Sequence, residues 1–434
     1  MLTQHNRLLR LAGPLILSNL TVAMQGMVDT AVVGHLDTPA YIGAVAVANV
    51  IFSFLYWGMG FLRMSTVGIV AQLMGADNPE RLRAALLHSC FLGAVIALTI
   101  LLLQSPVVRL GLNLLGGSAA VRGHAQVYFY WAVWAAPAVL LNMTCVGWLL
   151  GLHNARATLY IALLIGALNM LLDVVFVFGL QLDVRGVALA SVVAQYCGCT
   201  LAVYFIVGEL RRRPGSWSKS VILNRKDFTG LLALNQNIFI RTLCLIFALA
   251  FFTRQGAQQG ELVLAANAVL INFMLLVALG LDGFANAAEA LVGKAIGAGD
   301  QAQLQKSVHA TMLWGGAVAL LYSLLFVVAG NGLVNLMTSL EPVRETAYRY
   351  LPWMMVAPLI SVWCFLLDGI FIGATRGREL RNAMLFSTFI IYLPCWYLLQ
   401  DFGNHGLWSA LMAFFIARTL SLLWYYRGVA MWIG

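Results

Sequence analysis

The stretch QLMGADNPERL (residues 72–82) recurs in a weaker form as KAIGAGDQAQL (residues 294–304). Other parts of the chain repeat at the same offset of 220–223 residues. The aligned pairs are Gly75 with Gly297, Ala76 with Ala298, Leu82 with Leu304, Ala136-Pro137 with Ala357-Pro358, Gly151 with Gly373 and Arg156 with Arg378. A repeat at a fixed offset predicts two copies of one structural unit.

The composition decides the class of protein. The chain has 434 residues, of which 61% are hydrophobic and 10% are charged, and its mean hydropathy is +0.86. A soluble globular protein carries roughly 25% charged residues. A chain with so few charged residues cannot cover its surface with polar groups, so we predict a polytopic membrane protein.

Polar residues, Gly and Pro divide the chain into apolar segments, each long enough to cross a bilayer as a helix. We predict an all-α protein with twelve spans in two pseudo-symmetric six-helix bundles. The predicted spans are 11–36, 44–73, 84–110, 124–151, 156–179, 184–208, 230–254, 262–293, 306–332, 345–373, 382–400 and 405–427. Pro14 either kinks the first span or starts it.

The distribution of Lys and Arg predicts the orientation. We count Lys and Arg residues at the ends of spans with the adjoining side. If the N-terminus is inside, the inner side then holds 17 of the 26, the outer side holds 6, and Arg63, Arg241 and Arg418 lie within spans. Inner loops of membrane proteins are enriched in Lys and Arg. We therefore expect both termini in the cytoplasm, and the net charge of +9 needs no nucleic-acid partner.

The longest polar connection, ELRRRPGSWSKSVILNRKD (residues 209–227), falls after the sixth predicted span. It predicts an N-terminal lobe (1–208), a cytoplasmic linker (209–229) and a C-terminal lobe (230–434). Six spans in each half give parallel repeats, which favour a two-lobed transporter with a central cleft and alternating access.

Of the 17 acids, we expect five to be embedded in the membrane, away from the ends of the spans, where an ionised group is costly. Asp29 and Asp173 lie about 10 Å below the outer boundary of the first and fifth spans. Ser191 lies about 10 Å deep in the sixth span, Asn169 lies one turn before Asp173 on the same face, and Gln25 lies one turn inward from Asp29. Two buried carboxyl groups with little positive charge nearby favour protonation of at least one of them. These residues suit a proton relay, while their oxygen atoms also suit Na⁺, and structural hydrogen bonding is the alternative.

The other embedded acids, Asp282, Glu289 and Asp368, lie in the C-terminal half together with Arg241 and Arg418. They form either ion pairs that hold helices together or a secondary cation site. Asn142, in the fourth span, either lines a cleft and contacts substrate, as Gln25 could, or bonds between helices.

Motifs of soluble enzymes do not occur in the sequence: it contains no HExxH, GxSxG or GxxxxGK[ST]. We expect a protein that is not an enzyme and that holds no metal or cofactor. A membrane-embedded enzyme acting through its acids is the rival class, and the positions of the seven His residues, mostly in loops or near span ends, count against it.

Five stretches together resemble the multidrug and toxic compound extrusion (MATE) family, and within it the DinF branch. They are MVDTAVVGHL (27–36), VAQLMGADN (70–78), NMLLDVVFVFGL (169–180), LDGFANAAEALVGKAIGAGD (281–300) and FLLDGIFIGATRGREL (365–380). The resemblance implies drug export coupled to H⁺ or Na⁺. It also implies that Asp29, Asn169 and Asp173 match the coupling site of this branch, with Ser191 where relatives carry Thr.

The resemblance assigns three further residues. Asn142 matches a drug-contacting amide, and Pro14 matches a proline tied to bending of the first helix. Asp368 matches an aspartate of the cation site in the other bacterial branch, but the seventh-span glutamate of that site is missing here.

We therefore expect a monomeric multidrug exporter in a bacterial inner membrane, in contact with lipids, that exchanges bulky amphipathic or cationic compounds for H⁺. Na⁺ coupling is the first alternative. A flippase for lipid-linked precursors is the second, and it would favour a strongly basic cleft.

Overall fold

A computed structural model describes the backbone of residues 2–34, 39–116 and 118–427. The side chains at 2–3, 23, 27, 29–31, 33–34 and 39–40 lie outside the described part. In the described residues all regular structure is helical, which confirms the predicted all-α class.

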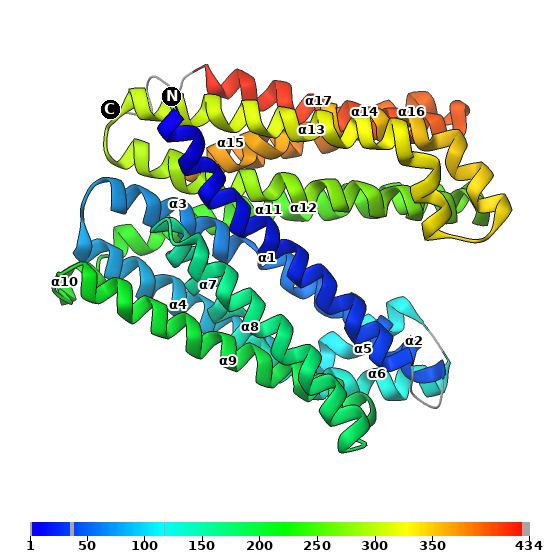
Figure 1. The fold of residues 1–434 in the computed structure, drawn as a ribbon, viewed down its shortest axis with the longest axis horizontal. Coiled ribbons are helices and arrows are strands. Elements are labelled where there is room, and N and C mark those ends of the chain that lie inside the picture. Colours follow the sequence, from blue (N-terminus) through cyan, green and yellow to red (C-terminus); the bar gives the residue numbers. More distant parts are fainter. Residues whose placement is uncertain (1, 35–38, 117, 428–434) are drawn as a thin grey trace. The chain divides into compact units, whose positions relative to one another are not determined.

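The chain divides into two compact units (Figure 1). Unit 1 contains residues 1–16 and 232–434, and unit 2 contains residues 17–231. The boundaries fall inside two long helices, α1 (Leu2–Gly34) and α11 (Arg225–Gln258). Pro14 lies inside α1, two residues before the boundary, so it does not start the helix.

Helices α2 to α10 belong to unit 2, and those after α11 belong to unit 1. Unit 2 holds α2 (Pro39–Gly58), α3 (Phe61–Gly75), α4 (Pro79–Leu102), α5 (Gln104–Leu115), α6 (Ala119–Ala132), 3₁₀ turn η1 (Val133–Ala135), α7 (Ala136–Gly151), α8 (Ala155–Val174), π-helix η2 (Val175–Gly179), α9 (Asp183–Arg212) and α10 (Lys219–Ile222). Unit 1 holds α12 (Glu261–Gly297), α13 (Gln301–Met337), α14 (Glu341–Gly373), α15 (Gly377–Leu385), π-helix η3 (Phe386–Tyr392), α16 (Leu393–Leu399), 3₁₀ turn η4 (Gln400–Phe402) and α17 (Gly403–Tyr426).

Among the described residues, eleven helical stretches are long and apolar enough to cross a membrane. The last stretch, Gly377–Tyr426, contains both the eleventh and the twelfth predicted spans. The chain turns between them at η4 and at Gly403, whose φ is +58°. Turns interrupt two predicted spans. A turn at Met59-Gly60 separates α2 from α3 within 44–73, and another turn follows Leu102 within 84–110.

The opening stretch QLMGADNPERL and its repeat build the same turn in both units. Helices α3 and α12 end at Gly75 and Gly297. Two residues later the backbone adopts a positive φ, at Asp77 (49°) and at Gly299 (66°). The next side chain, Asn78 or Asp300, then caps the following helix by accepting from the backbone N–H of Arg81 or Gln303.

A second repeated feature is close helix packing at paired glycines. In unit 1, a Cβ at Gly369 would lie 2.3 Å from the Ala285 carbonyl oxygen, and one at Gly373 would lie 2.5 Å from that of Glu289. In unit 2, a Cβ at Gly147 would lie 2.7 Å from the Arg63 carbonyl oxygen. Small residues of this kind let helix backbones approach closely in membrane proteins.

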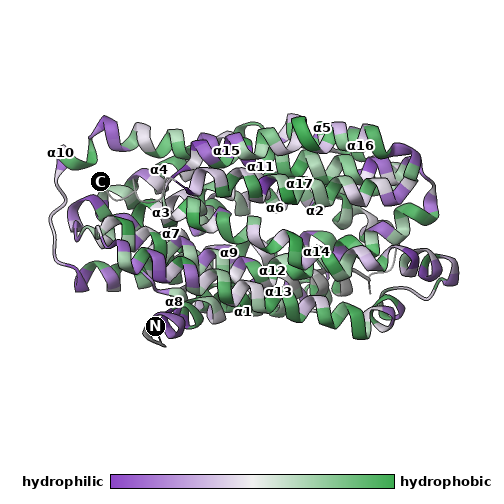
Figure 2. Ribbon diagram, turned by 90° about the horizontal axis from the view of Figure 1, so that it is seen from above, coloured by the Kyte–Doolittle hydropathy of each residue, from purple (hydrophilic) through white to green (hydrophobic). Residues whose placement is uncertain are grey.

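The exterior of the long helices is apolar. Figure 2 shows that hydrophobic residues dominate these helices, while hydrophilic residues gather near helix ends. Large apolar side chains are strongly exposed, for example Val328 at 86% and Leu102 at 73%. Such exposure suits contact with lipid and would be costly in water.

The start of α1 and the predicted linker do not belong to the units that the sequence suggested as a simple division at residue 208. Gln4 donates to Ser307 (2.7 Å) and Trp314 donates to Nδ1 of His5 (3.1 Å), so the start of α1 belongs to unit 1. The predicted linker, 209–229, belongs to unit 2.

Candidate functional site

Two predicted polar residues meet where α8 packs on α9 in unit 2 (Figure 1). Asn169, on α8, is fully buried, and its Nδ2 donates to Oγ of half-buried Ser191 on α9 at 3.1 Å. A buried amide in an apolar helix bundle is stabilised by such a bond, because an unsatisfied amide costs free energy.

Asp173 lies one turn beyond Asn169 on the same face of α8 and is also fully buried. It is the penultimate residue of α8, and the π-helix η2 follows at Val175. Single π-helical turns are frequent at functional sites. The structure therefore brings Asn169, Asp173 and Ser191 together in one buried region.

The side chain of Asp29 lies outside the described residues, but its backbone belongs to α1, so its level along that helix can be worked out. A Cβ at Gly166 on α8 would lie 2.8 Å from Cγ2 of Thr21 on α1. Farther along the chain Tyr41 and Gln181, which follow these helices, line one pocket, so α1 and α8 run in the same direction. Asp29 and Asp173 then lie about 12 Å and about 10.5 Å beyond the contact along their helices.

Asn142, on α7, forms a bond between helices. Its Nδ2 donates to the backbone oxygen of Gln195 (3.0 Å) and to Oε1 of the same residue (3.1 Å). Its Oδ1 is buried and has no hydrogen-bond partner among the described residues. Gln25, predicted as a second substrate contact, is half-buried on α1, one turn before Asp29.

Gln195 is a site residue that the sequence analysis missed. It lies four residues after Ser191 on α9, so both share a helix face. The i, i+4 spacing of two polar side chains in an apolar helix is the signal that identifies it. These residues extend the polar region of unit 2 from Asp173 to Asn142.

The backbone contact of Arg63 gives the level of this residue in unit 2. The one embedded basic residue predicted for this half is Arg63, on α3, and its backbone packs against Gly147 of α7. Gly147 lies five residues, or about 7.5 Å, beyond Asn142 along α7.

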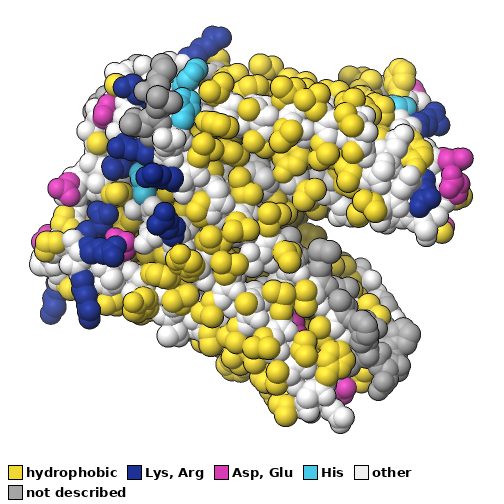
Figure 3. Space-filling model, in the orientation of Figure 1, with side chains coloured by type: hydrophobic (Ala, Val, Ile, Leu, Met, Phe, Trp, Pro, Cys, Tyr) yellow, Lys and Arg dark blue, Asp and Glu magenta, His cyan; other side chains and the backbone are white. Residues whose placement is uncertain are grey.

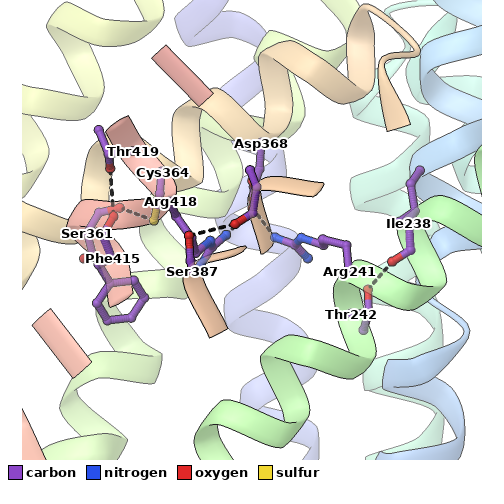
Figure 4. Close-up of polar contacts among 11 residues, drawn as sticks. Ile238, Arg241, Thr242, Ser361, Cys364, Asp368, Ser387, Phe415, Arg418 and Thr419 are labelled. Carbon is purple, nitrogen blue, oxygen red and sulfur yellow. Dashed lines mark hydrogen bonds and ion pairs between the residues drawn. The ribbon is translucent and has the colours of Figure 1, made fainter. Parts of the chain in front are cut away.

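The C-terminal acids have different surroundings. Asp368, on α14, lies between Arg241 of α11 and Arg418 of α17 (Figure 4). The Arg418 Nη2 atom is 2.6 Å from Oδ2 of Asp368, and Arg241 contacts the same oxygen. All three side chains are buried. This pairing is the ion-pair alternative for Asp368, and two guanidinium groups at one carboxylate disfavour a bound cation.

Asp282 and Glu289 lie seven residues apart on one face of α12. Asp282 is half-buried and Glu289 is buried. Among the described residues, no group of three or more His, Cys, Asp or Glu side chains could hold a metal ion.

Comparison with known proteins identifies the family. The MatE family model matches residues 14–175 and 238–398. The chain belongs to the MATE family. It is a multi-pass membrane protein, and members of this family are transporters, not enzymes.

Two curated relatives and one solved structure extend this finding. The chain is 42% identical over 417 residues to DNA damage-inducible protein F of Escherichia coli (strain K12), covering 95% of this chain and 90% of the relative. It is 24% identical to multidrug resistance protein NorM of Aliivibrio fischeri (strain ATCC 700601 / ES114), covering 97% and 95% of the two chains. The outward-facing conformation of a multidrug resistance MATE family transporter of the MOP superfamily has a TM-score of 0.87 at 18% identity, covering 99% and 96%. The last match confirms the predicted two-lobed fold.

Proposed function

We propose that this transporter exports bulky amphipathic or cationic organic compounds in exchange for H⁺, and that unit 2 holds the coupling site. The buried Asp173 beside the Asn169–Ser191 hydrogen bond is the observation that carries the proposal. An ionisable group at such a position in a membrane-spanning helix is a functional candidate because it is costly to keep there. The name of the NorM relative supports a drug substrate.

In the proposed mechanism, Asp29 and Asp173 bind the coupling proton. Asn169 and Ser191 hold Asp173 in position through the α8–α9 contact. A proton enters from outside and neutralises the acids in the conformation that is open to the outside. It leaves in the conformation that is open to the inside, so its binding shifts the balance between the two conformations. Asn142 and Gln25 are proposed substrate contacts on the inner side of these acids.

The same residues support Na⁺ as a second candidate. Carboxylate, amide and hydroxyl oxygens are the ligands that hard cations prefer. We favour H⁺ because two acids at similar levels, with Arg63 on the inner side, favour a shared proton. We further propose a monomer in the inner membrane of a bacterium, with both termini in the cytoplasm.

The experiment is transport of one fluorescent organic cation by purified protein in liposomes, with a pH gradient and a Na⁺ gradient imposed separately. We expect efflux driven by the pH gradient alone, and Asp29→Asn or Asp173→Asn to abolish it. Asp401→Asn, at an exposed acid of η4, is the matched control. Efflux driven only by the Na⁺ gradient would overturn the ion assignment.

A further inference from the structure

The end of α9, α10 and the start of α11 form a continuous segment that is held against α4 in unit 2. We call residues 209–228 the strap. Its anchor is Arg83 of α4, which is buried. Arg83 donates through Nη1 to the Pro79 oxygen (3.0 Å) and through Nη2 to the strap oxygens of Arg213 (2.7 Å) and Leu210 (3.2 Å). One planar guanidinium thus ties the strap to the start of α4.

Further contacts hold the strap along its length. Ser216 donates to Oε1 of Glu80 at 2.5 Å. Nε2 of His88 lies 2.6 Å from the Ile222 oxygen, at the end of α10. A Cβ at Gly215 would lie 2.6 Å from Arg83 Nη1, so the strap passes close to its anchor. These contacts fix the position of the strap backbone, while many of the strap side chains remain exposed.

The charged side chains that are exposed on the strap are all basic. Residues 209–227 contain six Lys and Arg residues and two acids. Both acids are already paired, Glu209 with Arg212 and Arg213, and Asp227 with Arg81. The exposed basic residues are Arg211, Arg212, Lys219, Arg225 and Lys226. Figure 3 shows Lys and Arg side chains gathered at the end of unit 2 that carries α10 in Figure 1.

Two large apolar side chains are exposed among these charges. Trp217 is 50% exposed and Leu223 is 77% exposed. The Trp217 ring lies 5.8 Å from the guanidinium carbon of Arg83, so the buried anchor also positions the indole. Trp is enriched at the level of lipid headgroups, because its ring is apolar and its N–H is polar.

We propose that the strap binds the headgroups of anionic phospholipids, with its basic side chains on the phosphates and with Trp217 and Leu223 inserted beside them. Orientation of a membrane protein requires only that Lys and Arg lie on the inner side. It does not require a strap held by a buried arginine, nor exposed apolar residues between the charges. Clusters of four to eight Lys and Arg residues next to membrane-spanning helices attract anionic lipids.

The test measures quenching of Trp217 fluorescence by brominated lipid. Full-length protein is placed in nanodiscs of phosphatidylcholine, or of an equimolar mixture with phosphatidylglycerol, and one of the two lipids is brominated. The signal of Trp217 is the difference between the wild type and Trp217→Phe. We expect brominated phosphatidylglycerol to quench this signal more strongly than brominated phosphatidylcholine, and added inorganic phosphate to leave the quenching unchanged.

Charge variants test the basic side chains. In a series of nanodiscs with increasing phosphatidylglycerol fraction, Lys219→Gln/Arg225→Gln/Lys226→Gln should raise the fraction needed for half-maximal quenching at least about fivefold, the factor expected for one lost charge. The control is Arg109→Gln/Arg185→Gln, which removes exposed charges elsewhere in unit 2 and should change nothing. Equal quenching by both lipids, no quenching, or competition by free phosphate would each refute lipid binding by the strap.

Discussion

At Asp368 one carboxylate oxygen serves two buried guanidinium groups, so the three side chains together carry a positive charge inside unit 1. Arg418 also lies over the rings of Phe414 (5.4 Å) and Phe365 (6.0 Å), which stabilise a cation. Removing the acid would leave two unpaired charges, whereas removing Arg241 would leave one neutral pair.

Asp368→Asn should therefore destabilise the protein more than Arg241→Gln does. Leaving buried charge unpaired costs about 3–5 kcal/mol, and the Arg241 variant should lose clearly less. Thermal unfolding of the purified variants in detergent measures both effects, with exposed Asp401→Asn as the control. Equal loss from both variants would show that the carboxylate is not the shared partner.

At Ser191 the hydroxyl is expected to matter more than the size of the side chain. Ser191→Ala removes the acceptor of the Asn169 bond, whereas Ser191→Thr keeps it. A lost hydrogen bond costs about 0.5–1.5 kcal/mol. We expect slower proton-coupled efflux by the Ala variant and near wild-type efflux by the Thr variant in liposomes. Equal efflux rates for the two variants would show that the Ser191 hydroxyl does not contribute to coupling.

At the scale of elements, the repeat of QLMGADNPERL correctly predicted that both units contain the same local structure. The repeat at Gly75 and Gly297 marks the same turn and the same type of cap in both units. The packing of Gly147 and Gly369 was not predicted, because a glycine in an apolar helix does not reveal which backbone it meets. The strap was predicted only as a linker, since the contacts of Arg83 join residues more than 120 positions apart.

The α12–α14 contact provides the test at this scale. Gly369→Ala would place a Cβ 2.3 Å from the Ala285 oxygen, so the helices must separate. Overpacking of this kind costs about 1–3 kcal/mol. Gly332→Ala, at an exposed α13 position with no atom within 4 Å, is the control and should not destabilise. Thermal unfolding compares the two variants, and no loss at Gly369 would mean that the helices are not closely packed.

At the scale of the whole molecule, the composition predicted the membrane class and the apolar segments predicted the arrangement of spans. The family was predicted from the resemblance of five stretches to the MATE family. The sequence also predicted that Asp29 and Asp173 lie at matching levels, because distance along a helix follows from residue number. It left the C-terminal acids with two alternatives, since ion pairing depends on which helix faces meet. The observed surroundings of Asp173 and Asp368 now suggest different roles for the two units.

Ion coupling and stability should therefore separate between the units. Asp173→Asn replaces a buried acid with an amide of nearly the same shape. If the acid is protonated in the folded protein, the substitution should leave the thermal midpoint nearly unchanged while efflux driven by the pH gradient is lost. Arg241→Gln should lower the thermal midpoint. The molecules that remain folded should still carry out efflux driven by the pH gradient, because the altered ion pair lies in unit 1.

The measurement pairs thermal unfolding with efflux per folded molecule for both variants at one pH gradient. Substrate binding to Asp173→Asn, followed by fluorescence anisotropy, separates lost coupling from lost recognition and should be retained. If Arg241→Gln also abolished the response to the pH gradient, Asp368 would take part in coupling. Unit 1 could then no longer be regarded as the unit held by static ion pairs, and the proton would have to be shared between acids of both halves of the chain.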